Sequence, residues 1–228
     1  MTGTMRTALV VGGFGGLGAA ISERLRADGF RVLRSSRTPR SDESDAIVLD
    51  GSSIGRLPEL DVVVWAHGIN INDAVDTFVG DDLARLLDVN VVLVARQLQG
   101  LLSAGRLRDG GAVVVISSMW EQVARPGKFS YTVSKAAVGG LVRAAAADLA
   151  PRGIRVNAVL PGVVDTAMTR AMLSSDQVAV VEGATGAGRM VRPEDVASVV
   201  SSLASVSNTG MTGQSVVVDL GFTVVRPL

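Results

Sequence analysis

The segment Val10–Gly18 reads VVGGFGGLG and decides the fold. It joins a short β-branched segment, Thr7–Val11, to a stretch with helical spacing, Leu17–Asp28. Glycines at a strand–helix turn let the backbone come close to a pyrophosphate, and the free amides of a helix N-terminus attract an anion. The segment therefore predicts a dinucleotide-binding turn, and a turn that merely packs the helix on the strand is the alternative.

Outward from this turn, short apolar segments alternate with helical ones. Such alternation predicts an α/β fold, a doubly wound parallel sheet with helices on both faces, in a single domain over residues 1–228. The expected strands are Thr7–Val11, Arg31–Arg34, Ala46–Leu49, Asp61–Ala66, Ala112–Ser117, Arg155–Leu160 and Ser215–Val218, and the expected helices are Leu17–Asp28, Asp81–Ser103, Ser130–Leu149 and Pro193–Ala204. The polar stretch Thr38–Asp45 is expected to be a surface loop, and Thr166–Arg192 a mobile lid.

The composition excludes several classes of protein. The 228 residues include no cysteine and one histidine, which rules out a disulfide scaffold, a cysteine nucleophile and a metal site built from several histidines. Lys and Arg equal Asp and Glu at 22 each, so no global basic field favours nucleic acid or an anionic membrane. The N-terminal segment lacks the layout of a signal peptide, and no apolar run is long enough to suggest a membrane span. A cytoplasmic protein without metal is the expectation.

Two motifs near the middle of the chain carry the candidate chemistry. Tyr131 and Lys135 are four residues apart, on one face of an expected helix, where the ammonium would favour the phenolate and lower the pKa of Tyr131. Ser118 follows an expected strand at the sheet edge that faces the ligand crevice. Together they could orient a carbonyl and give it a proton, whereas one buried tyrosine and one solvated lysine is the plain alternative.

The glycine pattern Gly12, Gly16, Gly18 and the segment Ile116–Ala137 together resemble the classical short-chain dehydrogenase/reductase (SDR) family, and the likeness runs from Thr7 to Val224. The resemblance implies a Rossmann-type fold and the catalytic residues Ser118, Tyr131, Lys135 and Asn90. Asn90 would kink or hydrate its helix and help to hold a water in a proton relay to Lys135, with a local helix hydrogen bond as the alternative.

The same resemblance implies a set of cofactor contacts spread over the loops that follow the strands. They are Gly12, Phe14, Gly16, Leu17, Gly18, Asp50, Gly51, Ala66, His67, Gly68, Tyr131, Lys135, Pro161, Gly162, Val164 and Thr166. Asp50 would bind the adenine amino group, and the backbone of Val164 the carboxamide. The chain departs from the family pattern at Val11, Trp65, His67 and Leu220, and the helix that usually lies around Ser52–Leu60 is expected to be short or absent.

The end of the second expected strand bears on the choice of dinucleotide. An acidic residue there would bind the adenosine ribose and repel a 2′-phosphate, but the chain has Ser36 followed by Arg37. A guanidinium binds phosphate through paired hydrogen bonds. We therefore expect NADP(H), with Arg37 as the chief contact and Ser36 as helper.

The expected reaction is hydride transfer between NADP(H) and a carbonyl compound, of 3-oxoacyl, polyketide-like or small cyclic ketone type. Oxidation of an alcohol and a catalytically silent dinucleotide sensor or scaffold are the alternatives. The resemblance also implies a homo-oligomer, a dimer or a homotetramer, with Asp81–Ser103 and Ser130–Leu149 at the dimer face.

Overall fold

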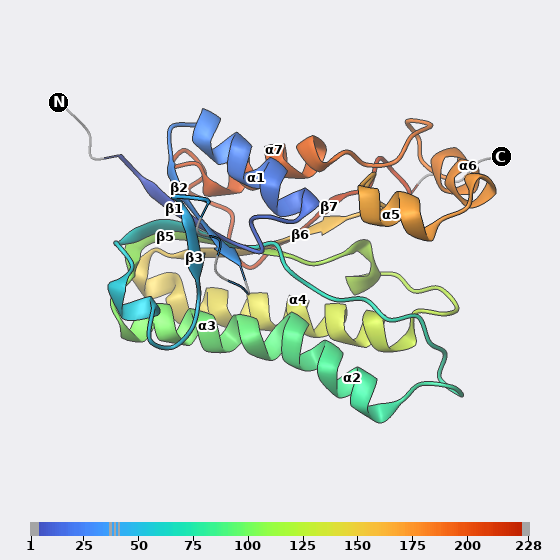
Figure 1. Ribbon diagram of the computed structural model, residues 1–228, viewed down its shortest axis with the longest axis horizontal. Helices are drawn as coiled ribbons and strands as arrows, with labels where there is room; N and C mark the ends of the chain where they lie inside the picture. Colours follow the sequence, from blue (N-terminus) through green and yellow to red (C-terminus); the bar gives the residue numbers. More distant parts are fainter. Residues whose placement is uncertain (1–4, 37, 39, 41, 225–228) are drawn as a thin grey trace.

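The computed structural model describes residues 5–36, 38, 40 and 42–224, and its centre is a parallel sheet of seven strands (Figure 1). The strand order is β3-β2-β1-β4-β5-β6-β7. The strands are β1 (Thr7–Val11), β2 (Arg31–Ser36), β3 (Ala46–Val48), β4 (Leu60–Trp65), β5 (Leu107–Ile116), β6 (Arg155–Pro161) and β7 (Ser215–Val218). The order reverses between β1 and β4, which confirms the doubly wound fold expected from the sequence.

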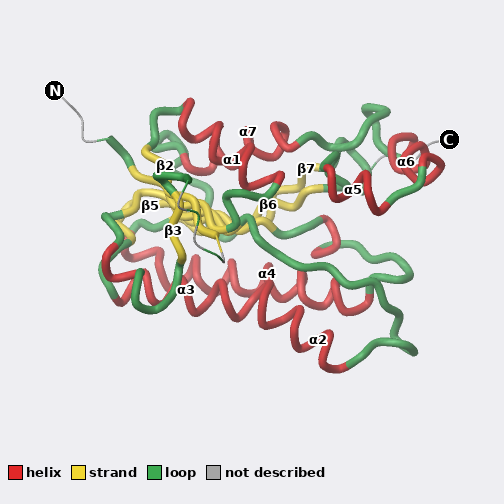
Figure 2. Tube along the Cα trace, in the orientation of Figure 1, coloured by secondary structure: helices red, strands yellow, loops and turns green. Residues whose placement is uncertain are grey.

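Helices cover both faces of the sheet, as the tube view shows (Figure 2). They are α1 (Gly16–Ala27), α2 (Gly80–Leu87), α3 (Leu93–Ser103), α4 (Phe129–Leu149), α5 (Ala167–Met172), α6 (Ser175–Gly183) and α7 (Pro193–Ala204). Helices α1 and α7 pack together on one face, and α3 and α4 lie on the other (Figure 1). The central strands are buried on both sides, which explains the apolar runs in β1, in Val62–Trp65 of β4 and in Ala158–Pro161 of β6.

The expected long helix over Asp81–Ser103 is interrupted. A π-helical turn, Asp88–Val92, separates α2 from α3 and holds Asn90, which is buried. The extra residue in such a turn shifts every following side chain around the helix axis. The helix is thus interrupted at Asn90, where the family resemblance implies a kink or a hydrated turn.

Strand β5 begins five residues earlier than predicted, at Leu107 instead of Ala112. The two glycines in between allow this, because Gly110 takes a positive φ of 76° and the pairing with β4 shifts register between Leu60 and Val62. A glycine inside a strand commonly marks such a bulge. The predicted start of the strand at Ala112 was therefore wrong.

The segment between β3 and β4 contains one 3₁₀ turn, Ile54–Arg56, in place of a helix, as expected from the sequence. The lid segment Thr166–Arg192 holds two short helices, α5 and α6, which lie at the end of the sheet where β6 and β7 finish (Figure 1).

The helical stretch Gly80–Ser103 is long and apolar enough, by length and composition alone, to cross a membrane. The sequence had suggested no apolar run long enough for a membrane span. In the structure this stretch lies along the sheet beside α4, and 33% of its most apolar window is buried.

Candidate active site

The site lies at the carboxyl edge of the sheet, where the order of the strands reverses. The loop after β1 and the loop after β4 meet here, since a Cβ on Gly12 would lie 3.0 Å from the Cβ of His67. Ligands of open α/β sheets bind in the crevice outside such a point.

The glycine turn between β1 and α1 has room for backbone alone. Gly12 has a positive φ of 78°, and a Cβ on Gly18 would lie 2.1 Å from the carbonyl oxygen of Gly12. Helix α1 starts at Gly16 after the N-cap Gly15, and neither a side-chain cap nor an acidic first-turn residue fills its N-terminus. This bare helix end fits a pyrophosphate, which would accept hydrogen bonds from its amides.

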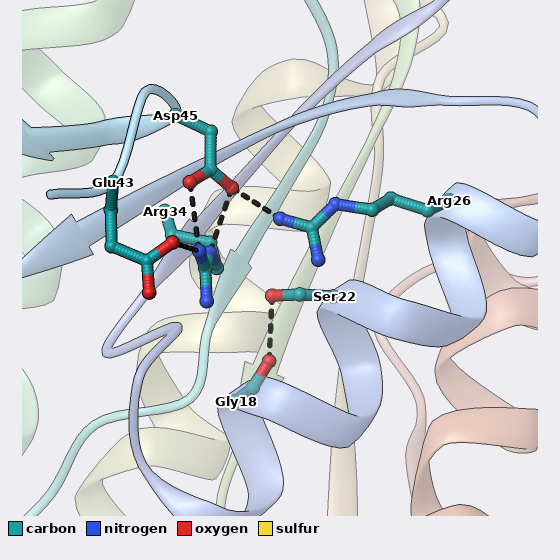
Figure 3. A network of polar contacts seen from close by, with 6 residues as sticks. All are labelled: Gly18, Ser22, Arg26, Arg34, Glu43 and Asp45. Carbon is teal, nitrogen blue, oxygen red and sulfur yellow. Dashed lines mark hydrogen bonds and ion pairs between the residues drawn. The ribbon is translucent and has the colours of Figure 1, made fainter.

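A charged network lies beside the glycine turn, at the end of β2 (Figure 3). Arg34 binds Asp45 through Nε and a terminal nitrogen, at 2.7 and 2.8 Å, and also binds Glu43 at 2.5 Å. Arg26 of α1 contacts the same Asp45 carboxylate. These carboxylates raise the pKa of Arg34, chiefly through its hydrogen bond to Asp45.

Phe14 of the glycine turn is stacked between two guanidinium groups. The Cζ of Arg34 lies 4.1 Å, and that of Arg40 4.4 Å, from the centre of the Phe14 ring. Ser36 donates a hydrogen bond to the carbonyl of Thr38 at 2.7 Å. Arg37, the expected chief contact of a 2′-phosphate, lies outside the described residues.

Asp50 and Gly51 lie at the rim of a hollow of about 520 Å³ between the end of β3 and α3. One oxygen of Asp50 accepts hydrogen bonds from the amides of Ser52 and Ser53, at 2.9 and 2.8 Å, and from the hydroxyl of Ser52. These bonds lower the pKa of the Asp50 carboxyl, the Ser52 hydroxyl most of all. The second carboxylate oxygen of Asp50 accepts none of these hydrogen bonds, so it can accept one from a ligand such as an adenine amino group.

The three residues expected to carry the chemistry come together. Ser118 follows β5 and is buried, and Tyr131 and Lys135 lie on successive turns of α4. The Lys135 Nζ is 5.7 Å from the centre of the Tyr131 ring and donates a hydrogen bond to the carbonyl of Ile116 at 3.2 Å. The spacing on one helix and the strand end before it therefore bring the two hydroxyls and the ammonium into one place.

The pKa of Tyr131 departs from the sequence expectation. Burial raises it to about 12, and the neighbouring group that lowers it is the hydroxyl of Ser118. The predicted lowering by Lys135 was wrong for this structure, because the loss of hydration dominates and the opposing effect comes from the Ser118 hydroxyl. Burial also lowers the pKa of Lys135 to about 8, while Glu121 acts in the opposite direction.

Asn90 connects the loop after β4 to α4. Its Oδ1 accepts from the amide of Ile69 at 2.9 Å, and its Nδ2 donates to the carbonyl of Ile69 and to the Ser134 hydroxyl, both at 3.1 Å. A Cβ on Gly68 would lie 3.2 Å from the Asn90 Oδ1 and 3.6 Å from the Lys135 Nζ. The Asn90 side chain is thus fully engaged within the chain, and it fixes the loop that lies against Lys135.

Ala66 and His67 lie beside the glycine turn. The Ala66 amide donates to the carbonyl of Val11 at 2.9 Å, and the His67 Nε2 is 3.1 Å from the carbonyl of Val89. Burial lowers the pKa of His67, and Lys135 lowers it further, so the ring is neutral near pH 7. Its Nδ1 is buried without a hydrogen-bond partner in the described part of the chain, a position that suits a ligand hydroxyl.

The loop from Pro161 to Thr166 closes the other side of the crevice. A β-bridge joins Val164 to Val191 through hydrogen bonds made by the carbonyl of Val163 and the amide of Asp165. The bridge therefore does not use the amide and carbonyl of Val164 itself. Gly162 passes close to Asp219, and Thr166 touches the glycine turn, since its Cγ2 is 3.3 Å from where a Cβ on Gly16 would lie. The Thr166 hydroxyl also caps α5 by accepting from the amide of Thr169.

Sequence reasoning missed two charged residues here. Lys128, three residues before Tyr131, is buried with its Nζ 5.1 Å from the centre of the Tyr131 ring. Glu121 accepts from the Ser215 hydroxyl at 2.5 Å, and its other oxygen is buried without a partner within the described residues. The predicted helix began at Ser130, so the three-residue spacing between Lys128 and Tyr131 was not recognised as a helical one. In the described residues no group of three acidic or histidine side chains could hold a metal ion.

Known proteins resemble this chain over most of its length. A family model described as enoyl-(acyl carrier protein) reductase matches residues 13–223. Human dehydrogenase/reductase SDR family member 4 is 32% identical, over 95% of this chain and 87% of its own. The 3-oxoacyl-(acyl-carrier-protein) reductase of Salmonella typhimurium is 30% identical, over 96% of this chain and 98% of its own.

Solved structures agree with these relatives. A gluconate 5-dehydrogenase from Burkholderia cenocepacia, solved in complex with NADP and tartrate, superposes with a TM-score of 0.86 at 26% identity, covering 97% of this chain and 96% of that one. The family model begins within the glycine turn and extends over the Tyr131 helix and the last strand. The chain therefore belongs to the short-chain dehydrogenase/reductase family of oxidoreductases, which interconvert alcohols and carbonyl compounds with a nicotinamide dinucleotide.

Proposed function

We propose that this protein is an NADP(H)-dependent reductase that converts a ketone or an aldehyde into an alcohol. The observation that carries the proposal is the position of the Tyr131 phenol, which has the Ser118 hydroxyl and the Lys135 ammonium as neighbours. The glycine turn of Gly12–Gly18 ends at the same crevice. A proton donor and a dinucleotide site are thus adjacent, as carbonyl reduction requires.

Each side chain has a part that follows from its chemistry. The bound cofactor supplies a hydride to the carbonyl carbon. Ser118 donates a hydrogen bond to the carbonyl oxygen, and Tyr131 gives that oxygen a proton as negative charge develops on it. Lys135, with N–H groups beyond the one on Ile116, holds the cofactor ribose and stabilises the phenolate that remains. Asn90 keeps the loop of Gly68 and Ile69 against this lysine.

The pKa of Tyr131 favours reduction over oxidation. At about 12, it keeps the phenol protonated near pH 7, in the form that donates a proton. Oxidation of an alcohol would need the phenolate as base, which burial disfavours. Alcohol oxidation with NADP⁺ should therefore be slow near neutrality and rise with pH.

The preference for NADP(H) rests on the charges around the adenosine end. No acid follows Ser35 in β2, and Arg40 stacks on Phe14 with no ion pair in the described part of the chain. Arg34 is already bound by Asp45 and Glu43, so we assign the 2′-phosphate to Arg37 and Arg40, with Ser36 beside them. The Burkholderia relative is a complex with NADP, which agrees with this preference.

The cofactor assignment is tested with Arg37→Ala and Arg40→Ala. Loss of a charge-assisted bond to phosphate should raise the KM for NADPH by about 10- to 100-fold and leave that for NADH unchanged. Arg31→Ala, at the opposite end of β2, controls for the change in net charge. Equal use of both dinucleotides by the wild type would refute the preference.

The reaction is tested by following NADPH consumption over a panel of ketones and aldehydes. Tyr131→Phe should lower the rate by about 100-fold or more, because it removes the proton donor and keeps the ring. A protein that binds NADPH and reduces nothing on a broad panel would support the silent sensor instead. Faster turnover of alcohols with NADP⁺ than of carbonyls with NADPH at pH 7 would reverse the proposed direction.

A further inference from the structure

Lys128 is a buried cation next to the proton donor, and the reaction just described does not use it. It is 6% exposed, and it immediately precedes α4. Its Nζ lies 5.1 Å from the centre of the Tyr131 ring and donates to the Oδ1 of Asn70 at 2.8 Å. Burying an ammonium group is costly unless an anion compensates it.

Within the described residues, no carboxylate forms an ion pair with this ammonium. The carboxylate that acts on it, Asp73, accepts from the amide of Ser130 at 2.9 Å and lies beyond ion-pair distance. Arg125 adds further positive charge nearby. Within the described residues, the Lys128 ammonium thus has Asn70 as its hydrogen-bond partner and no ion-paired carboxylate, although Asp73 lies close enough to act on its charge.

The position of Lys128 points to the substrate and not to the cofactor. Lys135 approaches the Tyr131 ring beside Gly68, which belongs to the loop that faces the glycine turn. Lys128 approaches the same ring from the preceding turn of the chain, beside Asn70, which is two residues further along that loop and exposed. The two lysines thus lie near the same ring but contact different parts of the loop, with Lys135 beside Gly68 and Lys128 bonded to Asn70.

Lys128 and Asn70 together form a pair of donors. Because the Asn70 Oδ1 accepts from Lys128, its amide nitrogen is left to donate to another group. An ammonium and an amide side by side match the two oxygens of a carboxylate. Burial lowers the pKa of Lys128 to about 8, so the ammonium form still predominates at pH 7.

We propose that Lys128 determines specificity by binding the carboxylate of the substrate, so that this reductase acts on small oxo acids and yields hydroxy acids. This inference rests on the proposed function, because the carbonyl to be reduced is the one at Tyr131. The carboxylate and the carbonyl are then a few bonds apart, since both bind within the space around one ring.

The test compares three oxo acids with their methyl esters: 2-oxopropanoate, 3-oxobutanoate and 4-oxopentanoate, at pH 7 with NADPH. Each pair differs in the charge and in one methyl group. We expect the acid of at least one pair to have a kcat/KM at least 10-fold above that of its ester. Lys128→Gln should lower that value for the acid by about 10- to 100-fold, mainly through KM, and change the ester less than 3-fold.

Two further variants separate charge from structure. Lys128→Arg should restore much of the preference for the acid, and Arg31→Gln, which changes net charge at the other end of the sheet, should leave it unchanged. Equal losses for acid and ester in Lys128→Gln would overturn the inference and make Lys128 a structural residue. A wild type that prefers the ester in all three pairs would overturn it too.

Binding without turnover distinguishes the two proposals. Calorimetric titration of the acids into the protein saturated with NADP⁺ should show binding that Lys128→Gln weakens. Binding of this kind with no reduction of any substrate would uphold the anion site and contradict the reductase. Reduction of neutral carbonyls without binding of the acids would contradict the anion site alone.

Discussion

Lys135 is an ionisable group that the fold holds at a cost in stability. It is 4% exposed, and within the described residues its ammonium makes one hydrogen bond, to the carbonyl of Ile116. Burial brings its pKa down from 10.5 to about 8. The folded protein therefore binds this proton less tightly than the unfolded chain does, and the difference opposes folding wherever the group is charged.

Replacing Lys135 with Met should stabilise the protein near neutral pH while abolishing turnover. The shift in pKa corresponds to a destabilisation on the order of 3 kcal/mol below pH 8, less what the bond to Ile116 returns. As the pH rises from about 8 to 10.5, the unfolded chain keeps the proton that the folded protein has lost, so the stability of the wild type increases. The melting temperature of Lys135→Met should exceed that of the wild type at pH 7, and the gap should narrow towards pH 10.

A control variant tests that reading of the pH dependence. Arg96→Met removes an exposed cation from α3, and it should leave the melting temperature nearly unchanged at both pH values. A constant difference between Lys135→Met and the wild type from pH 7 to pH 10 would mean that packing, and not ionisation, accounts for the change.

Site residues that are separated by a fixed helical spacing, or that follow a strand directly, can be located from the sequence alone. Tyr131 and Lys135 are four apart in a helix, and Ser118 follows a strand, so local geometry alone brings them to one edge of the sheet. Lys128 and Arg34 depend on contacts with residues distant in sequence, Asn70 at one site and Asp45 at the other. No periodicity encodes such contacts, and so the sequence reading left both residues out.

At the scale of elements, the glycine turn depends on how closely α1 approaches β1. Gly18→Ala would put a Cβ 2.1 Å from the carbonyl oxygen of Gly12, which must move the helix away from the strand. We expect a loss of about 3 kcal/mol or more in the free energy of unfolding, as for a severely overpacked core position. Gly15→Ala, where a Cβ would meet its nearest atom at 3.6 Å and φ is −77°, should stay within about 0.5 kcal/mol of the wild type.

Urea unfolding of the two variants measures this predicted difference in stability. Similar midpoints for Gly18→Ala and Gly15→Ala would show that the turn tolerates a side chain at both places and that the close approach is not needed. Dinucleotide binding, followed by NADPH fluorescence, should be lost in Gly18→Ala even where the protein is folded.

The π-helical turn depends on Asn90. Asn90→Ala removes three hydrogen bonds, one of them buried and two partly buried, and leaves the amide and carbonyl of Ile69 without their partners. We expect a loss of about 2–4 kcal/mol in unfolding free energy, together with a fall in kcat/KM under conditions where the variant is folded. Gln99→Ala, at an exposed position of α3, should change neither quantity, and an Asn90→Ala variant as stable as the wild type would exclude this anchoring role.

The elements with strong periodicity were predicted closely, and those shaped by tertiary contacts were not. The α7 helix and the β7 strand have the predicted bounds, because Pro193 opens the helix and a short apolar run defines the strand. The interruption at Asp88–Val92 leaves no mark in the hydrophobic pattern. It follows from the bonds of Asn90 to a loop and to α4, which only the folded chain brings near.

At the scale of the whole molecule, the helix layers on the two faces of the sheet differ in how much of their apolar surface is buried. Helices α1 and α7 pack against each other, and their apolar side chains join a buried cluster. On the other face, the apolar window within Gly80–Ser103 is only 33% buried. The neighbouring α4 exposes a stripe of small residues at helical spacing, namely Val133, Ala136, Gly140, Ala144 and Ala147. An apolar face of this kind needs a partner in water.

We predict that a second copy of the chain covers this face, which makes the protein at least a dimer, as the family resemblance implies. Small side chains let two helices approach closely across a two-fold axis. The pair Gly140→Arg and Ala144→Arg should therefore convert the wild type into a monomer, without unfolding it, because both sites are exposed and arginine is a good helix former. Light scattering gives the mass, and Val206→Arg, at a position 69% exposed after α7, is the matched control. A wild type that is monomeric at all concentrations would contradict the dimer. An arginine double variant with the mass of the wild type would mean that the subunits meet at another surface.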